Sequence, residues 1–306
     1  MSAATRIAAA LDSDVARSFR NSPITIAAAI LLAVCLIGAG FAPWLAPHNP
    51  FDLKTLNLLD ALTPPMWIEG GKSTFFLGTD DQGRDLLSAI MFGSRVSLLV
   101  GIVSVFFAML IGVSLGLLAG YAGGKTEAFI MRVADVQLSF PAILIALLIS
   151  GVARAAFPGE AQDKLAVVVL VIAIALANWV QYARTVRGST LVEKNKEYVQ
   201  AARVIGIHPV AIMFKHVLPN ALGPVLVLAT INIATAIITE ATLSFLGVGV
   251  PPTEPSLGTL IRVGNDFLFS GEWWVTVFPG AALVVMVLSV NLLGDWLRDA
   301  LNPKLR

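Results

Sequence analysis

Six long apolar stretches decide what kind of structure this chain can form. They cover residues 24–45, 97–120, 136–153, 165–183, 217–239 and 274–294, and none of them contains Asp, Glu, Lys or Arg. A helix needs about 20 apolar residues to cross a bilayer core of ~30 Å, because each residue adds ~1.5 Å. The sequence therefore predicts an all-α membrane protein with six transmembrane helices. The third stretch is short and contains Pro141.

The composition excludes several other classes of protein. Only 13% of the residues are charged and 57% are hydrophobic, whereas soluble domains have about 25% charged residues. A net charge of +1 argues against a nucleic-acid partner and leaves membrane lipid as the surrounding medium. Cys35, the one cysteine, cannot form an intrachain disulfide. The first apolar stretch exceeds the ~7–15 residues of a signal-peptide core, so we expect an uncleaved membrane helix.

The distribution of Lys and Arg predicts the orientation. With the N-terminus inside, the inner segments are 1–23, 121–135, 184–216 and 295–306, and they contain 14 Lys and Arg residues. The outer segments, 48–96, 154–164 and 240–273, contain 7. Because inner loops carry the excess of basic residues, we expect both termini in the cytoplasm.

Glycines recur at four-residue intervals in the second stretch. They are Gly112, Gly116, Gly120 and Gly124. This spacing predicts a flat helix face that another helix backbone can approach closely. The face serves either ordinary bundle packing or a helix contact that moves during transport.

No motif indicates catalysis, a cofactor or a metal in this chain. The segment AGYAGGKTE resembles a phosphate-binding loop, but Ala119 stands where the first glycine belongs, and a membrane helix replaces the required strand. His208 and His216 lie eight residues apart without zinc-ligand spacing. The sequence contains no arrangement of a nucleophile with a base, and no carboxylate pair, that predicts an enzyme.

Two carboxylates lie next to apolar stretches. Glu240 follows 23 uncharged residues, and ionisable groups in or near a membrane usually face a cavity or a partner. Glu240 is therefore a candidate for the substrate pathway, and the alternative is an interfacial or hydrogen-bonding group. Asp135, on the inner side of the third stretch, is a weaker candidate for the substrate pathway on the same grounds.

The most basic inner loop contains a semi-polar segment that predicts a helical hairpin. Residues 193–205 favour a short helix, Gly206 can end it, and Pro209 suits the first turn of a second helix that runs to Pro219. Apolar and small residues share one side of the first helix: Tyr198, Ala201, Ala202 and Ile205. The pattern alone fits either a docking surface for another protein or a helix lying on the membrane.

The spacing of this hairpin resembles the EAA loop found in the membrane subunits of ABC importers. The matching positions are Glu197, Ala201, Ala202, Gly206 and Leu218–Pro219, whereas His216 stands where that family usually has an apolar residue. The resemblance implies that the loop, about 193–219, is a coupling helix seated in a groove of a separate ATPase subunit. By this resemblance the contacts would be Glu197, Tyr198, Ala201, Ala202, Arg203, Gly206, Ile207 and His208.

Three further blocks are similar to the C-type permeases of dipeptide, oligopeptide and nickel importers, and most of all to dipeptide permease C subunits. They are LGTDDQGRDLLSAIMFGSR, TEATLSFLGVGVPPTEP and GDWLRDALNPKLR, while Leu257 replaces a Trp that is usual in relatives. The resemblance implies a type I ABC importer permease fold. Residues 1–96 would hold the inner tail, the first helix and an external loop; 97–295 would form a five-helix core, and 296–306 an inner tail.

The same resemblance implies the function and the partners. The chain would be a permease subunit without its own ATPase, in a bacterial cytoplasmic (inner) membrane, importing dipeptides or short oligopeptides. A homologous B-type permease, two ATP-binding subunits holding ATP and Mg, and a periplasmic or lipid-anchored binding protein would complete the complex. Nickel chelates, glutathione or haem are alternative cargoes. A stand-alone secondary transporter usually shows repeats or charged groups within its spans, and these six spans contain no charged group.

Overall fold

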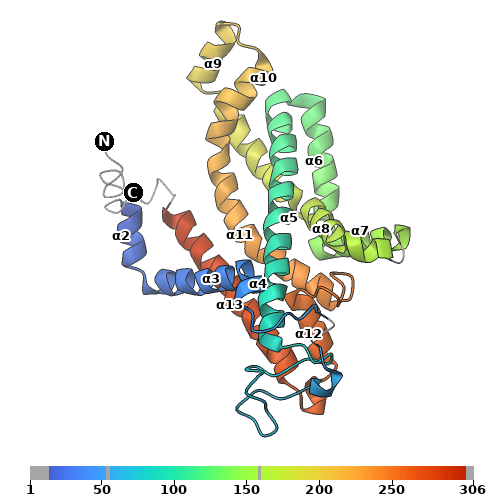
Figure 1. Cartoon of the computed structure of the whole chain (residues 1–306). Helices are drawn as coiled ribbons and strands as arrows, with labels where there is room; N and C mark the ends of the chain where they lie inside the picture. The colour runs from blue at the N-terminus through green and yellow to red at the C-terminus, as the bar shows by residue number, and fades with distance from the viewer. Residues whose placement is uncertain (1–13, 53–55, 158–159, 301–306) are drawn as a thin grey trace. The chain divides into compact units, whose positions relative to one another are not determined.

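A computed structural model describes residues 14–52, 56–157 and 160–300, and the regular elements in these ranges are all helices (Figure 1). The chain divides into two compact units, Met1–Arg95 with Val263–Arg306, and Val96–Arg262. Five helical segments are long and apolar enough to cross a membrane: Pro23–Gly40, Leu86–Ala122, Leu165–Glu193, Pro209–Phe245 and Trp274–Ala300. A bent pair of helices makes a sixth span if its two parts are counted together. The predicted all-α membrane fold is confirmed.

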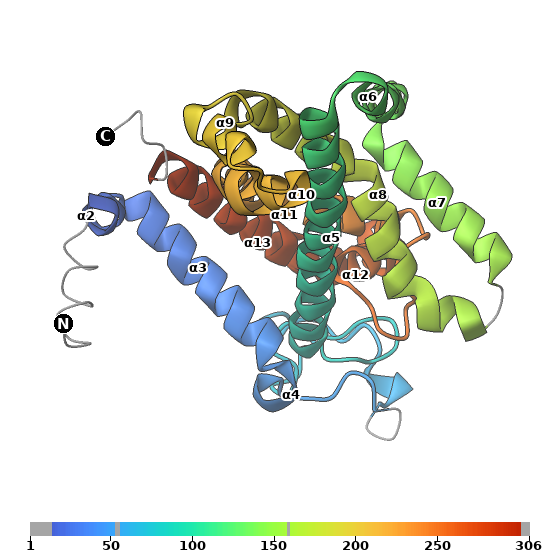
Figure 2. The same cartoon turned by 90° about the horizontal axis from the view of Figure 1, so that it is seen from above.

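The bent pair corrects the expected third span. Instead of one helix over 136–153, α6 (Gly124–Leu138) and α7 (Ala142–Ala156) meet at 92°. Pro141 lies at the break with an extended backbone, φ −56° and ψ 131°. Proline lacks an N–H, and its ring disfavours a helical conformation of the preceding residue, here Phe140. After the break, α7 lies beside α8 (Glu160–Glu193), as Figure 2 shows.

In the first unit, α3 (Pro23–Gly40) packs along α13 (Trp274–Ala300). Ser22 caps α3 by accepting a hydrogen bond from the backbone N–H of Thr25, and Pro23 occupies the first turn, where no N–H is needed. The preceding short helix, α2 (Asp14–Arg20), is held by an edge-to-face contact of Phe19 with Trp296, with ring centroids 5.2 Å apart.

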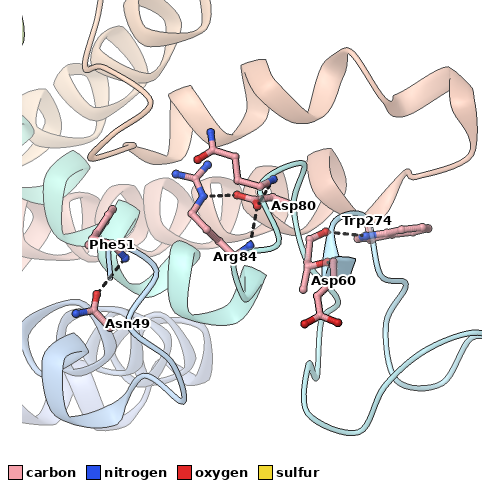
Figure 3. A network of polar contacts seen from close by, with 8 residues as sticks. Asn49, Phe51, Asp60, Asp80, Arg84 and Trp274 are labelled. Carbon is pink, nitrogen blue, oxygen red and sulfur yellow. Dashed lines mark hydrogen bonds and ion pairs between the residues drawn. The ribbon is translucent and has the colours of Figure 1, made fainter. Parts of the chain in front are cut away.

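A loop of the first unit, residues 57–85, is ordered by buried polar contacts (Figure 3). It starts with the short 3-10 helix η1 (Leu58–Asp60) and precedes α5 (Leu86–Ala122). The Arg84 guanidinium donates from Nε to Oδ2 of Asp80 at 2.6 Å, and both side chains are buried. The Trp274 indole donates to the carbonyl of Thr79 at 3.3 Å, which fixes the loop to the start of α13.

In the second unit, α5 and α8 approach closely along the glycine face. A Cβ added at Gly112 would lie 2.5 Å from the carbonyl oxygen of Trp179, and one at Gly120 would lie 2.7 Å from Cβ of Thr190. Between them, Gly116 faces the backbone of Ala183. Gly124 does not belong to this face: it has φ +56° at the start of α6, and an added Cβ would have no neighbour within 4 Å.

α11 (Leu218–Phe245) packs against α8 and leads to α12 (Leu257–Asn265). The buried apolar core of this unit includes Val100, Leu170, Ile174, Val225 and Leu243. The same core extends to the end of the unit that carries α9 (Glu197–Val204) and α10 (Pro209–Ile212). These two short helices follow α8 and precede α11, so they lie where α8 ends and α11 begins (Figure 1).

Candidate functional site

The predicted helical hairpin is present, and its turn has a defined geometry. Gly206 adopts φ +81°, a left-handed conformation that glycine tolerates best. The N–H of Gly206 donates to Arg203 O at 3.0 Å, and the N–H of Ile207 donates to Ala202 O at 3.1 Å. This pair of bonds is a Schellman motif, which satisfies carbonyls at the end of α9. His208 then caps α10 by accepting from the N–H of Val210 at 3.3 Å.

Both ends of the hairpin differ from the sequence expectation. The first helix begins at Glu197 rather than at 193, because α8 itself runs to Glu193. The second arm does not end at Pro219. It continues from α10 through a π-helical turn, η2 (Met213–Val217), directly into α11. Pro219 lies in the first turn of α11, directly after the π-helical turn.

The hairpin has a buried side and an exposed apolar side. Val199 and Ala202 are buried against Ile212 in the core. Ala202 therefore packs the two arms together, which corrects its expected role as a direct contact for another protein. Ala201, one residue earlier and about 100° around the helix, is exposed.

The exposed apolar side agrees only in part with the predicted one, which includes Ile205 but not Val204. It consists of Val204, Ile205, Val210 and Phe214, which we call the hairpin patch; Val204 is 89% and Ile205 77% exposed. Val199 and Ala202 are three residues apart and therefore lie on the same face of α9, which is the buried one. This spacing is the sequence signal that Val204, at the end of α9, points outwards. Large exposed apolar groups next to charged residues are typical of a docking surface.

Most of the remaining predicted contacts are exposed to solvent. Glu197, Arg203 and His208 are exposed, and Ile207 is partly buried. The Arg203 guanidinium lies 5.6 Å from the ring centroid of Tyr121 at the end of α5. An added Cβ at Gly206 would meet nothing within 4 Å, so the turn is open to an approaching partner.

Tyr198 holds the hairpin in place. Its phenol donates to Oε2 of Glu193 at 2.6 Å, while the Asn220 amide donates to the phenol oxygen at 3.1 Å and to His216 O at 2.8 Å. Tyr198 therefore connects α9 with the end of α8 and the start of α11. This network uses the backbone carbonyl of His216 and does not depend on the identity of its side chain. Lys194 adds a third connection by donating to Gly120 O of α5 at 2.6 Å.

The structure does not place Glu240 on a pathway. Its side chain is 0% exposed, and its carboxylate accepts hydrogen bonds from the hydroxyls of Ser97 and Ser244, each at 2.7 Å. The Ser97 oxygen also accepts from the N–H of Leu257 at 3.3 Å. These contacts tie α5, α11 and the start of α12 together, which supports the hydrogen-bonding interpretation of Glu240.

Asp135 also has a structural partner. Its carboxylate pairs with the Arg184 guanidinium at 2.5 Å, with both side chains about half exposed (54% and 49%). Such exposed pairs contribute about 0–1 kcal/mol. Among the residues that the structure describes, no group of three His, Cys, Asp or Glu side chains could hold a metal ion.

Comparison with known proteins identifies the class. A family model described as the inner membrane component of binding-protein-dependent transport systems matches residues 112–306. The chain belongs to this family. A second model, the N-terminal transmembrane domain of oligopeptide transport permease C, matches residues 13–65.

Individual relatives narrow the comparison. The di/tripeptide transport permease DppC of Pseudomonas aeruginosa is 39% identical over 95% of this chain and 91% of its own length. The dipeptide permease DppC of Escherichia coli K12 is 41% identical over 94% and 91%. The glutathione permease GsiD of Pectobacterium atrosepticum is 38% identical over 95% and 90%.

A solved structure shares the fold. A chain of the MetNI methionine ABC transporter, in an inward-facing conformation, matches with a TM-score of 0.53 at 22% identity, over 68% of this chain and 93% of that one. The predicted fold, that of an ABC importer permease, is confirmed, as is the resemblance to dipeptide permease C subunits.

Proposed function

We propose that this chain is one of two membrane subunits of an ATP-driven importer that takes up dipeptides or short oligopeptides. The observation that carries the proposal is the ordered hairpin, with an exposed apolar patch, in a chain 38–41% identical to peptide permeases. ATP and Mg would bind to two partner ATPase subunits, and a homologous B-type permease would complete the pore. An external binding protein would deliver the peptide.

The orientation of the chain is part of this proposal. With both termini in the cytoplasm of a bacterium, the hairpin faces the cytoplasm and the 57–85 loop faces the outside. Residues 97–295 then form the permease core, flanked by the N-terminal segment 1–96 and the tail 296–306. The excess of Lys and Arg in the inner segments, 14 against 7, supports this arrangement.

The hairpin is suited to transmit movement. ATP binding would draw the two ATPase subunits together, and each hairpin seated on them would be displaced. Its capped turn and the Tyr198 network resist bending, so the displacement reaches α8 and α11. In this scheme the ATPase subunit contacts the exposed residues Ala201, Val204 and Ile205 and the open turn at Gly206. Tyr198 and Ala202 do not touch the ATPase but hold these contact residues in position.

Aspartate substitutions in the hairpin patch test the docking role. Ile205→Asp places a charge in an apolar interface but leaves the core of the hairpin intact, because Ile205 is 77% exposed. We expect the purified variant to insert normally and to lose at least tenfold in ATPase-subunit binding and in uptake. Gly206→Asp and Glu197→Lys should behave similarly. The matched control is Phe269→Asp, at a residue of the other unit that is 95% exposed. This variant should bind the ATPase subunits as the wild type does. Normal uptake by Ile205→Asp would contradict the proposal.

Glutathione is a second candidate cargo, because the Pectobacterium relative is 38% identical to this chain. The complex with its own binding protein should be assembled in lipid nanodiscs for this comparison. Stimulation of ATP hydrolysis by dipeptides and not by glutathione would support the first assignment, and the reverse would support the second.

A further inference from the structure

A polar cavity lies in the second unit, at the ends of α8 and α11 remote from the hairpin. Its volume is about 250 Å³, and it opens to solvent between the end of α7, the first turns of α8 and the loop that follows α11. A water molecule occupies about 30 Å³ of liquid, so the cavity has room for a small polar molecule or part of one. In the proposed orientation, this cavity faces the outside.

Two guanidinium groups and one carboxylate line the cavity. Arg154 comes from the last turn of α7, Arg262 from α12 and Asp163 from the start of α8. Arg154 uses one nitrogen to donate to Gly249 O at 3.0 Å. Nε of Arg262 is buried and has no hydrogen-bond partner within the part of the chain that the structure describes. A buried donor without a partner is unfavourable, so a ligand that accepts from it is favoured.

The charges around the cavity select the type of ligand. Arg154 and Arg262 are close enough to repel each other, and Arg154 is attracted by Asp163. A carboxylate between the two guanidinium groups would relieve their repulsion and could accept two parallel hydrogen bonds. Asp163 disfavours a plain anion but favours a ligand that also carries a positive group. The cavity therefore suits a small zwitterion.

Two glycines, Gly247 and Gly249, belong to the lining of the cavity. A Cβ added at Gly247, which has φ +81°, would lie 3.3 Å from Nη1 of Arg262 and would press on the guanidinium. At Gly249 an added Cβ would overlap the Ser244 side chain, so the backbone here passes close to α11. Glycine at these two positions lets the loop lie close to the side chains of Arg262 and Ser244.

We propose that this cavity binds the two charged ends of a short peptide, its carboxylate at Arg154 and Arg262 and its ammonium group at Asp163. The proposal rests on the function proposed above and adds a binding site on the permease itself, separate from the external binding protein. The peptide occupies the cavity when it leaves the binding protein and before it enters the membrane.

Binding of Ala-Ala to the assembled complex, in nanodiscs and without the binding protein, tests the site. The dissociation constants of Ala-Ala, Ala-Ala-amide and N-acetyl-Ala-Ala should be measured for the wild type, Arg262→Gln and Asp163→Asn. We expect the amide to bind the wild type at least tenfold more weakly than Ala-Ala, and Arg262→Gln to weaken Ala-Ala by a similar factor. The difference between the amide and Ala-Ala should then be smaller for Arg262→Gln than for the wild type, because Arg154 alone still contacts the carboxylate.

Asp163→Asn should abolish the difference between Ala-Ala and its N-acetyl form. Arg132→Gln, which removes an exposed arginine of α6 away from the cavity, is the matched control and should bind as the wild type does. Each variant is checked for assembly by gel filtration and thermal unfolding, and Arg262→Lys provides a variant that keeps the charge.

The outcomes separate the two proposals. In one outcome, the complete wild-type importer takes up Ala-Ala, but the amide binds more weakly than Ala-Ala by the same factor in Arg262→Gln and in the wild type. The cavity is then not the peptide site. No detectable binding to the wild-type complex would overturn the site as well. If Arg262→Gln instead weakens docking of the binding protein while peptide binding is unchanged, the cavity receives a carboxylate of that protein. If the complete importer takes up no peptide, the proposed function fails, and the site fails with it.

Discussion

The phenol of Tyr198 donates a 2.6 Å hydrogen bond to the carboxylate of Glu193, and this contact joins the first helix of the hairpin to the last residue of α8. Asn220, in the first turn of α11, donates to the same phenol oxygen at 3.1 Å. One side chain thus connects three helices whose movements must be coordinated if the hairpin is to drive the membrane helices.

Tyr198→Phe should loosen this connection without unfolding the hairpin, because Val199 and Ala202 still pack in its core. Hydrogen bonds to a charged acceptor contribute about 1.5–3 kcal/mol, and the partial exposure of Tyr198 reduces this to about 1 kcal/mol. We expect ATPase subunits to bind normally, while the number of peptides imported per ATP falls several-fold. An unchanged ratio of transport to hydrolysis would show that the phenol is dispensable.

The same contact predicts a dependence on alkaline pH. Partial burial, together with the hydrogen bond and negative charge of Glu193, raises the pKa of Tyr198. A raised pKa means that the protonated phenol stabilises the fold below the usual value of about 10, and that this contribution is lost as the pH rises through the higher value. Ultraviolet titration of the wild type minus Tyr198→Phe should show a tyrosine ionising above pH 10. Ionisation at or below that value would refute the expectation.

The contact between α5 and α8 predicts sensitivity to added atoms at Gly116. A Cβ there would meet the backbone of Ala183, which cannot move aside as a flexible side chain would. We expect Gly116→Ala to lower the free energy of unfolding by about 1–3 kcal/mol, seen as a lower Tm in detergent. Gly188→Ala, at a position of α8 with no neighbour within 4 Å, is the control and should leave Tm unchanged or slightly higher. Equal Tm values for both variants would contradict close packing.

Glu240 should matter for stability rather than for transport. Glu240→Ala leaves the hydroxyls of Ser97 and Ser244 without their acceptor, at a cost of about 1–3 kcal/mol. Glu240→Gln keeps an acceptor oxygen and should cost less. Uptake per correctly assembled complex should be equal in the wild type and in Glu240→Gln. If Glu240→Gln changes the peptide preference while Tm stays the same, Glu240 contacts the substrate pathway.

The buried ion pair of the 57–85 loop predicts a local effect. Arg84→Met leaves the Asp80 carboxylate buried without its guanidinium, and such losses cost about 3–5 kcal/mol. We expect faster hydrogen exchange across residues 57–85, measured by mass spectrometry. Asp80→Asn combined with Arg84→Met should recover part of the protection, since the uncompensated charge is removed. Slower exchange in the single variant than in the double would argue against the pair as the cause.

The sequence predicted the membrane helices and the hairpin turn because these depend on local chemistry. Uncharged apolar stretches identify the spans, and Gly206 and Pro209 have backbone preferences that act within a few residues. The bend at Pro141 was signalled by a proline, but its 92° angle depends on the packing of α7 against α8, which no local pattern contains.

Two side chains show what local patterns miss. The sequence suggests Glu240 for a pathway because ionisable groups near a membrane usually face a cavity or a partner, and its partner Ser97 is 143 positions away in the chain. The helical pattern and the EAA-loop resemblance put Ala202 on the docking surface, but its side chain is buried within the hairpin. Tertiary contacts determined both roles.

α8 has a mechanical consequence. Its 34 residues contain no proline and extend about 51 Å, from the Asp163 turn at the cavity to Glu193 at the hairpin. α11 returns between the same two ends, but it begins with the π-helical turn η2 and contains Pro224. α8 is thus one continuous helix beside α11, and α11 follows a π-helical turn at the hairpin end. In the proposed transport cycle, a displacement of the hairpin would be carried along α8 and would bend α11 at this turn, so that both ends of the unit would move together.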